Sequence, residues 1–513
     1  RKWRDRRRRD VSRASEQDGG RCRCRPVMPP SDDVGEAKPR DAQQCVFTLA
    51  DVAKHNTADD LWLAIDGGVY DVTSYLKQHP GGQVLATWAG RDASDVFTAW
   101  HTDGVRRKLP RFRVGTLAAP ADADAAARAA GFADAATLVA YEADKKAMLK
   151  SFADRGYYDT DFRVYARAFA TPPALFLLSI VIVLLTSTWQ AHALAGLVLG
   201  LGWHQVAWIG HDVMHSSVLK GRVRNHVLGC LYGNFFGGIS VGWWKYTHDM
   251  HHATTNEHER DPDITHLPFV AVTEKMFLSA NARPLTAVEL ALLKVAVPLQ
   301  HLTYLPIMFV AARFNLYWQS IYMLFVGHRV LAMPFQSVHY GAKVVNAERL
   351  ALVGFWLWYL AVCYAAYARA GAAGAFAYFA VSHLYMGVLH VQISLSHWER
   401  PHASACEKSP REKEWFYHQI VTARDITPTA FMNWYMGGLN LQCAHHIAPR
   451  VARHHLPAAT VEVRNFCRKW NIPYTESGML PAVWEVASSL CDVAGKVKQL
   501  DERRAAALIR KSE

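Results

Sequence analysis

The sequence predicts an N-terminal α+β domain followed by an all-α domain that crosses a membrane several times and carries a histidine-rich cap. Three observations predict this architecture. Short strand patterns around a Gly-rich turn lie before residue 119. Long stretches without Lys, Arg, Asp or Glu follow residue 170. Three histidine clusters lie beside these stretches, and 513 residues are enough for two domains.

Residues 1–44 form a basic and polar segment that we expect to be disordered. Of the formal net charge of +12, residues 1–27 supply +7, from 11 Lys/Arg and 4 Asp/Glu. Such an Arg run can bind nucleic acid or anionic lipid. We instead interpret it as translated upstream sequence or the remnant of a precursor, with Met28 as a possible start, and we expect no nucleic-acid partner. It lacks the apolar core of a secretory signal, and acidic residues interrupt a transit-peptide pattern.

The nine cysteines are scattered and no CxxC pair occurs among them. This distribution argues against a zinc ribbon or a disulfide framework and indicates a reducing compartment.

Residues 45–118 predict the compact α+β domain. Two short strands, 61–65 and 69–72, flank a turn at 66–68. His79 follows on a turn with Pro80 and two glycines, and His101 ends a helical pattern 22 residues later. Two neutral imidazoles that face each other across an apolar slot can ligate haem iron axially.

This stretch resembles cytochrome b5 through LWLAI, GxVYDVT, HPGG and GRDASDVFTAWH. The resemblance implies that haem b is bound with His79 and His101 as axial ligands. A cytochrome b5-like fold that has lost haem, or that binds a steroid-like ligand, is the alternative. Residues 119–170 predict a linker that passes into a surface helix at 141–152, so the electron donor would be tethered at a high effective concentration.

Residues 171–475 predict the membrane domain. Residues 173–186 and 191–210 form one apolar hairpin, and residues 350–368 and 372–394 form another. Segments 227–244 and 293–333 fit either interfacial helices or a further hairpin. An even number of crossings brings the histidine clusters and the N-terminal domain to one face, which we expect to be cytosolic. Residues 476–513 predict a polar C-terminal tail.

The histidine clusters have the spacing of metal ligands on helices. Residues three or four apart share a helical face, and imidazole suits iron, zinc and copper. Eight imidazoles are too many for one structural ion, so we interpret the set as a site for two metals. Iron fits best, because a nearby haem protein would deliver single electrons for oxygen activation. The candidate ligands are His211, His215, His248, His251, His252, His397, Gln442, His445 and His446.

The boxes HDVMH, HDMHH and QCAHH resemble those of front-end fatty acid desaturases with a fused cytochrome b5 domain, and GWWKYT, DPDITHLP, WYMGG and QISLSH match flanking sequence. The resemblance implies an O2-dependent desaturase that introduces a double bond into a polyunsaturated fatty acyl chain, of Δ5, Δ6 or Δ8 type. It also implies two iron ions, a membrane lipid or acyl-CoA substrate, NADH-cytochrome b5 reductase as electron donor and a multi-pass location in the endoplasmic reticulum membrane. The sequence departs from the family at Ala448 and Ala452.

Other functions and roles remain open at this stage. A sphingolipid Δ8 long-chain-base desaturase, a lipid hydroxylase of the same iron chemistry and a haem-binding membrane adaptor are the alternatives, and a plastid membrane is the alternative location. His204 and His390 lie seven residues before His211 and His397, so we expect them to support those ligands. Asp212 and Asp249 are expected to hydrogen-bond near the metals rather than to coordinate them.

Overall fold

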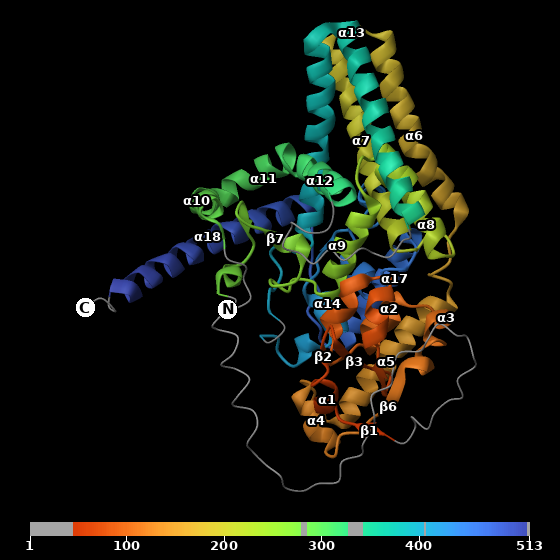
Figure 1. Cartoon of the computed structure of the whole chain (residues 1–513), viewed down its shortest axis with the longest axis vertical. Coiled ribbons are helices and arrows are strands. Elements are labelled where there is room, and N and C mark those ends of the chain that lie inside the picture. The colour runs from red at the N-terminus through yellow and green to blue at the C-terminus, as the bar shows by residue number, and fades with distance from the viewer. Residues whose placement is uncertain (1–44, 279–284, 327–341, 405–406, 510–513) are drawn as a thin grey trace, which may run out of the picture. The chain divides into compact units, whose positions relative to one another are not determined.

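The computed structural model describes residues 45–278, 285–326, 342–404 and 407–509, so the N-terminal segment 1–44 and its expected disorder lie outside the described residues (Figure 1). The described chain has an N-terminal α+β domain, two long helical hairpins and a cap of short helices that joins them.

The N-terminal domain is built on one mixed sheet. The strands are β1 (Val46–Phe47), β2 (Asn56–Thr57), β3 (Asp60–Ile65), β4 (Gly68–Asp71), β5 (Arg91–Asp92) and β6 (Arg113–Leu117). Their order is β1-β6-β4-β3-β2, with β5 also paired to β3. The antiparallel pair β3–β4 confirms the predicted hairpin, and its turn contains Gly67 with φ of 75°, a conformation that glycine adopts without strain.

Short helices cover the sheet and present the two histidines of this domain. They are α1 (Leu49–Val52), η1 (Thr73–Gln78), η2 (Gly82–Trp88), α2 (Ser94–Trp100), α3 (Asp103–Arg106) and η3 (Leu109–Phe112). His79 ends η1 and His101 ends α2, so each imidazole is held at a helix terminus.

The segment after this domain contains α4 (Ala123–Ala129) and α5 (Ala135–Asp154). The prediction of a surface helix missed the buried face of α5. Tyr141, Lys145, Met148 and Phe152 recur every three or four residues and are all buried. Tyr141, Met148 and Phe152 pack in one core with residues of the N-terminal domain and of the cap. Because Lys145 lies among these buried residues, the sequence pattern was read as that of a solvent-exposed helix.

The two predicted hairpins are confirmed. The first is α6 (Phe162–Leu185) with α7 (Trp189–Met214), and the second is α13 (Ala342–Leu395), which folds back at Ala370–Gly371. The helices α6, α7 and α13 are each long and apolar enough to cross a membrane. The arms pack around Trp203, Phe355 and Tyr359, and other large apolar side chains such as Leu177, Leu357 and Phe376 are exposed on their outer faces.

A third apolar region runs crosswise to the hairpins in Figure 1. It consists of α10 (Ala287–Ala296), η7 (Val297–Leu299), α11 (Gln300–Val310), α12 (Ala312–Ile321) and the π-helix η8 (Tyr322–Val326). The stretch Ala287–Val310 is long and apolar enough to cross a membrane, but a 3-10 turn at η7 interrupts it. This breakage and its crosswise course fit the interfacial helices that were one of the two predictions here.

The cap is made of the remaining elements, and these carry most of the candidate ligands. They are α8 (Arg222–Gly229), η4 (Cys230–Phe236), α9 (Val241–Ala253), η5 (Pro262–Ile264), β7 (Thr265–His266), β8 (Val270–Ala271), η6 (Glu274–Phe277), η9 (Arg411–Lys413), α14 (Trp415–Val421), β9 (Asp425–Ile426), α15 (Ala430–Tyr435), α16 (Gln442–Ile447), η10 (Arg453–His455), α17 (Leu456–Lys469) and β10 (Glu476–Ser477). The C-terminal segment forms a long helix, α18 (Met479–Ile509), whose first turns pack Ala482, Val486 and Leu490 into the cap.

Candidate metal centre

Four elements bring the candidate ligands together at the junction of the hairpins and the cap. His211 and His215 lie at the end of α7, and His397 follows the end of α13. The other histidine boxes lie on α9 and α16. All eight histidines and Gln442 meet in one region, although only the pairs within each box are close in sequence.

One group of imidazoles points its Nε2 atoms at a common point. The Nε2 of His211 lies 3.2 Å from those of both His215 and His248. The Nε2 of His252 lies 3.2 Å from that of His248 and 3.1 Å from that of His445. The group His211, His215, His248 and His445 has all its nearest ligand atoms within 4.8 Å of one another. Several lone pairs of neutral imidazoles aimed at one point are suited to a shared cation.

A second group consists of His251, His397 and His446, whose ligand atoms also lie within 4.8 Å of one another. In each ring Nδ1 already has a hydrogen-bond partner. His251 Nδ1 contacts Asp261 Oδ2 at 2.9 Å, and His397 Nδ1 contacts the Thr422 carbonyl at 2.9 Å.

His446 Nδ1 completes this pattern, because it contacts Gln419 Oε1 at 2.8 Å. Partners of this kind fix the tautomer and leave Nε2 free for a metal. The three partners were not identified from the sequence. Asp261 belongs to the DPDITHLP motif, whose match to desaturase sequence could have pointed to it. Gln419 and Thr422 lie in segments that contain no such motif.

Burial keeps most of these rings neutral. It lowers the pKa well below the usual imidazole range in a set that comprises His215, His248, His252, His397, His445 and His446. His251 differs. Burial lowers its pKa too, but the carboxylates of Asp261 and Asp263 outweigh this and the pKa rises to about 9. The metal-binding form of histidine is neutral imidazole, so the first six rings are ready to bind without losing a proton.

Gln442 begins α16, is buried, and hydrogen-bonds the side chain of His397. The start of this helix is fixed by Asp425, whose Oδ1 accepts from the backbone N–H of Cys443 at 2.9 Å. Cys443 is buried on a different side, against the Ile420 carbonyl. The donor set at the centre is therefore imidazole with one amide, which suits iron, zinc or copper rather than calcium or magnesium.

The two aspartates inside the boxes both have protein partners. Asp212 accepts from Tyr165 Oη at 2.8 Å and pairs with Arg453, while Asp249 pairs with Lys245 at 2.9 Å. His204, which we expected to support His211, instead contacts Gln392 Oε1 at 2.8 Å. His204 and His211 lie on one face of α7, but seven residues separate them along the helix. The His204 ring therefore contacts α13 and not the His211 ring.

The N-terminal domain holds its two histidines close together, with their ring planes tilted by 49°. The ring centroids of His79 and His101 are 6.0 Å apart. His101 Nδ1 contacts the Phe97 carbonyl at 3.0 Å, which leaves Nε2 for a ligand. A side chain at Gly81 would have its Cβ 3.0 Å from the His79 ring, so a larger residue there would press on that imidazole. Burial lowers the pKa of His79 to about 3 and that of His101 to about 4, and both rings stay neutral as axial haem ligands must.

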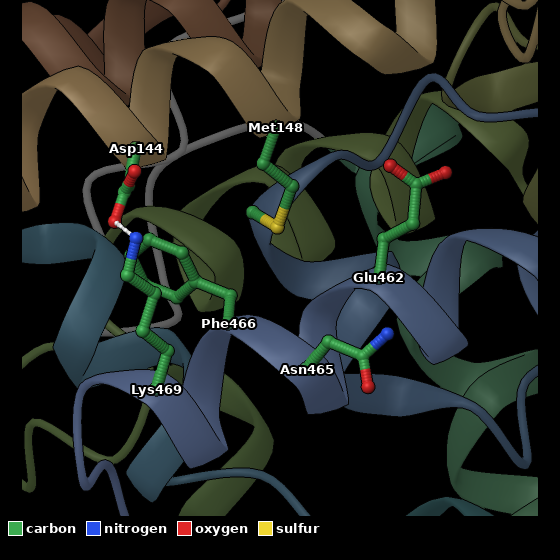
Figure 2. A pocket seen from close by; sticks show the side chains of 6 residues that line it. All are labelled: Asp144, Met148, Glu462, Asn465, Phe466 and Lys469. Atoms are coloured by element: carbon green, nitrogen blue, oxygen red, sulfur yellow. Dashed lines mark ion pairs between the residues drawn. The ribbon is translucent and has the colours of Figure 1, made fainter.

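A surface pocket between α5 and α17 is separate from this chemistry. Figure 2 shows its lining, which consists of Asp144, Met148, Glu462, Asn465, Phe466 and Lys469. Lys469 and Asp144 form an ion pair of 2.5 Å at its edge. Because no histidine lines it, the pocket offers none of the metal or haem ligands.

Comparison with known families agrees with both halves of the structure. Residues 187–478 match the model of the fatty acid desaturase family. Residues 48–118 match that of the cytochrome b5-like haem/steroid-binding domain. The first match covers more than half of the chain and contains every candidate metal ligand, and the second contains both His79 and His101.

Curated relatives match long stretches of this chain. A Delta(8)-fatty-acid desaturase 2 of Arabidopsis thaliana is 32% identical over 86% of this chain and 91% of its own. An acyl-lipid (9-3)-desaturase of Borago officinalis is 31% identical over 83% and 89%. A Delta 8-(E)-sphingolipid desaturase of Komagataella phaffii is 30% identical over 68% and 62%.

Proposed function

The chain belongs to the fatty acid desaturase family and carries its own cytochrome b5-like domain, and from this premise we propose that it is a front-end desaturase of polyunsaturated acyl chains. The observation that carries the proposal is the convergence of eight imidazoles, seven of them buried and that of His248 half-buried, beside a histidine pair suited to haem. A non-enzymatic haem-binding adaptor would have no use for this cluster.

The proposed reaction converts one carbon–carbon single bond of the acyl chain into a double bond. Two C–H bonds break and one π bond forms, while O2, two protons and two electrons join the two hydrogens to give two waters. Iron supplies oxygen activation and haem supplies one-electron transfer. The buried cap residues exclude bulk water from the site, which limits loss of the oxidant to side reactions.

We assign haem b to the pair His79 and His101, and two iron ions to the histidine cluster. One iron would be held by the first group with His252, and the other by the second group with Gln442 nearby. Asp261, Gln419 and the Thr422 carbonyl orient the rings of the second group, as their contacts with Nδ1 support.

The electron source and location follow from this assignment. NADH-cytochrome b5 reductase would reduce the haem domain. The endoplasmic reticulum membrane is the proposed location, with the cap and haem domain cytosolic. Both hairpins begin and end at the cap, since His211 lies near the end of α7 and His397 follows the end of α13, and these are the arms that return to the cap; this supports a single face for all ligands.

The substrate is either an acyl lipid, an acyl-CoA or a sphingoid base. The Arabidopsis thaliana and Borago officinalis relatives are named for fatty acyl chains, whereas the Komagataella phaffii relative is named for sphingolipids. The first two cover more of this chain, and we therefore put acyl chains first and the sphingolipid long-chain base second.

Lipid analysis of yeast that expresses the full chain tests the proposal. With polyunsaturated fatty acids in the medium, gas chromatography–mass spectrometry should find a new double bond on the carboxyl side of an existing one. A new bond only in hydrolysed long-chain bases would select the second substrate, and a hydroxylated product would reject desaturation. The His251→Ala variant should give no product, because it removes one proposed ligand.

A further inference from the structure

Trp100 lies where the N-terminal domain meets the histidine cluster. It is the last residue of α2 and directly precedes His101. Its ring centroid is 5.3 Å from that of His215 and 5.4 Å from that of His252. One aromatic side chain therefore contacts two proposed iron ligands and is adjacent in the chain to a proposed haem ligand.

Lys245 holds the indole from the side of the cluster. Its Nζ lies 5.7 Å from the Trp100 ring centroid, a cation–π distance. The same Nζ donates to the Met214 carbonyl at 2.9 Å and pairs with Asp249 at 2.9 Å. Because Met214 precedes His215, Lys245 ties the position of the indole to that of the first histidine box.

Arg450 holds the backbone on both sides of Trp100. Its Nε donates to the Ala99 carbonyl at 3.1 Å, and its Nη2 lies 3.3 Å from the His101 carbonyl. The guanidinium packs over Tyr158 at 5.0 Å from the ring centroid. Arg450 follows the third histidine box by four residues. The segment that carries His445 and His446 is therefore also hydrogen-bonded to the end of α2, next to the proposed haem ligand.

Buried apolar packing keeps this contact closed. Phe97 of α2 belongs to the same core cluster as Phe416 and Ala444 of the cap. Val84 of η2 packs against Trp243 and Met250 of the cap. The contact at Trp100 is thus part of a continuous core rather than an isolated touch between two surfaces.

We propose that Trp100 is the positioning residue that bridges electron transfer from the haem domain to the iron cluster, held by Arg450 and Lys245. This inference rests on the proposed function. With haem and iron bound, each transfer would carry one electron from the haem to the iron cluster, while the indole would keep its charge and no bond would form or break. Two transfers supply the two electrons of the reaction. Electron transfer slows with every gap between packed atoms, so a residue that is bonded to His101 and whose ring contacts His215 and His252 shortens the path.

The test compares Trp100→Leu and Trp100→Phe in the haem- and iron-loaded full chain. The haem is reduced under argon, the protein is mixed with O2 and substrate, and haem oxidation is followed at the Soret band. The rate in chelator-treated protein is subtracted as background. Trp100→Leu should slow oxidation by about tenfold or more because it leaves a gap in the contact, and Trp100→Phe by no more than about threefold. The matched control Trp62→Leu, which removes a ring stacked on His55 instead, should oxidise at the wild-type rate.

A second measurement separates bridging from docking. Hydrogen exchange of residues 97–101 reports whether the domains are in contact. It is measured in protein that carries haem but has no iron in the histidine cluster. Protection should be unchanged in both Trp100 variants and lost in Arg450→Met. The Soret spectrum and the haem reduction potential should equal those of the wild type in all of them.

The failing outcomes are distinct. If the wild type makes no desaturated product, the proposed function fails. If it makes product, but Trp100→Leu oxidises its haem at the wild-type rate with protection intact, only the bridge is overturned. Absence of protection at 97–101 in the wild type, or a change in haem potential large enough to explain a slower rate, also overturns it.

Discussion

At the scale of single residues, the carboxylate of Asp261 orients His251. It is fully buried, contacts His251 Nδ1 at 2.9 Å and accepts from the backbone N–H of Asn256 at 2.8 Å. Asp261→Asn keeps the size but loses the charge. We expect iron affinity to fall by about 10- to 100-fold, as for other partners of metal-bound histidine. Iron content measured by plasma mass spectrometry after dialysis against a graded chelator tests this, with the exposed Asp492→Asn as control. Equal iron retention in the two variants would contradict the orienting role.

Single residues also show where prediction from sequence stops. The boxes were predictable because His248, His251 and His252 repeat at three and four residues, which places them on one helical face. Gln419 reaches His446 from α14, 27 residues away, and no local spacing marks such a partner. Trp100 was visible only as a neighbour of His101. Its contact with His215 depends on how two domains pack, which the sequence does not encode locally.

At the scale of elements, the fold-back of α13 depends on Gly371. Its φ of 67° with ψ of −167° is a conformation reserved for glycine, and a Cβ there would meet no neighbouring atom. Gly371→Ala should therefore destabilise the protein through backbone strain alone, by about 1 to 3 kcal/mol. Thermal unfolding in detergent measures this. Gly495→Ala, in an equally open position within α18, should be neutral or slightly stabilising, because alanine favours helix. A similar loss in both variants would reject the strain.

A second element, α16, is held at its start by Asp425, and this contact predicts a pH dependence. Burial raises the pKa of Asp425 to about 6, against the ordinary 3.8. Between these values the folded protein keeps a proton that the unfolded chain has lost, so stability falls as pH rises from about 4 to about 6. The loss is about 3 kcal/mol for about two pKa units.

Asp425→Asn removes this titration and retains a hydrogen-bond acceptor for the Cys443 N–H. The melting temperature of the variant relative to wild type should rise between pH 4 and pH 6 and then level off. Because both proteins bind the same metals, other titrations cancel in the difference. A flat difference across this range would show that Asp425 titrates normally.

The elements themselves were largely predictable. The hairpins follow from uncharged stretches of membrane-spanning length, and the turn of the second hairpin follows from Arg369-Ala-Gly371. α6 begins at Phe162, eleven residues before the predicted apolar segment, because Asp161 caps it by accepting from the Arg163 N–H at 2.8 Å. The helix therefore includes polar turns that hydropathy alone leaves out.

At the scale of the whole molecule, the sequence predicted two domains and a tether, but not that they share a core. Leu61 of the sheet, Phe152 of α5 and Phe466 of α17 belong to one buried cluster. Each of these elements has an ordinary amphipathic pattern, which predicts that one of its faces is buried. The pattern does not predict which other element covers that face. The tether therefore acts as a packed helix as well as a linker.

Lys145 is the ionic centre of that packing and gives the prediction for the whole molecule. Only 3% of its side chain is exposed, and its Nζ lies 3.0 Å from Asp95 of α2, 2.8 Å from Glu142 and 2.9 Å from Glu414 of the cap. Burial lowers its pKa, but the three carboxylates together raise it above the ordinary lysine value, so the side chain is charged. Lys145→Met would leave these carboxylates close together without a cation. We expect a loss of about 3 kcal/mol, the cost of breaking a buried pair.

Lys150→Met on the same helix is the matched control, because the Lys150–Asp154 pair is 2.5 Å long but its lysine is 71% exposed. It should cost less than about 1 kcal/mol. Thermal unfolding of the haem-loaded protein and the rate of tryptic cleavage within residues 119–134 measure both variants. Faster cleavage only in Lys145→Met would mean that the haem domain has separated from the cap. Because we propose that electrons pass through that contact, haem oxidation should slow in the same variant while the haem spectrum stays unchanged. Equal behaviour of the two variants would mean that apolar packing alone holds the domains together.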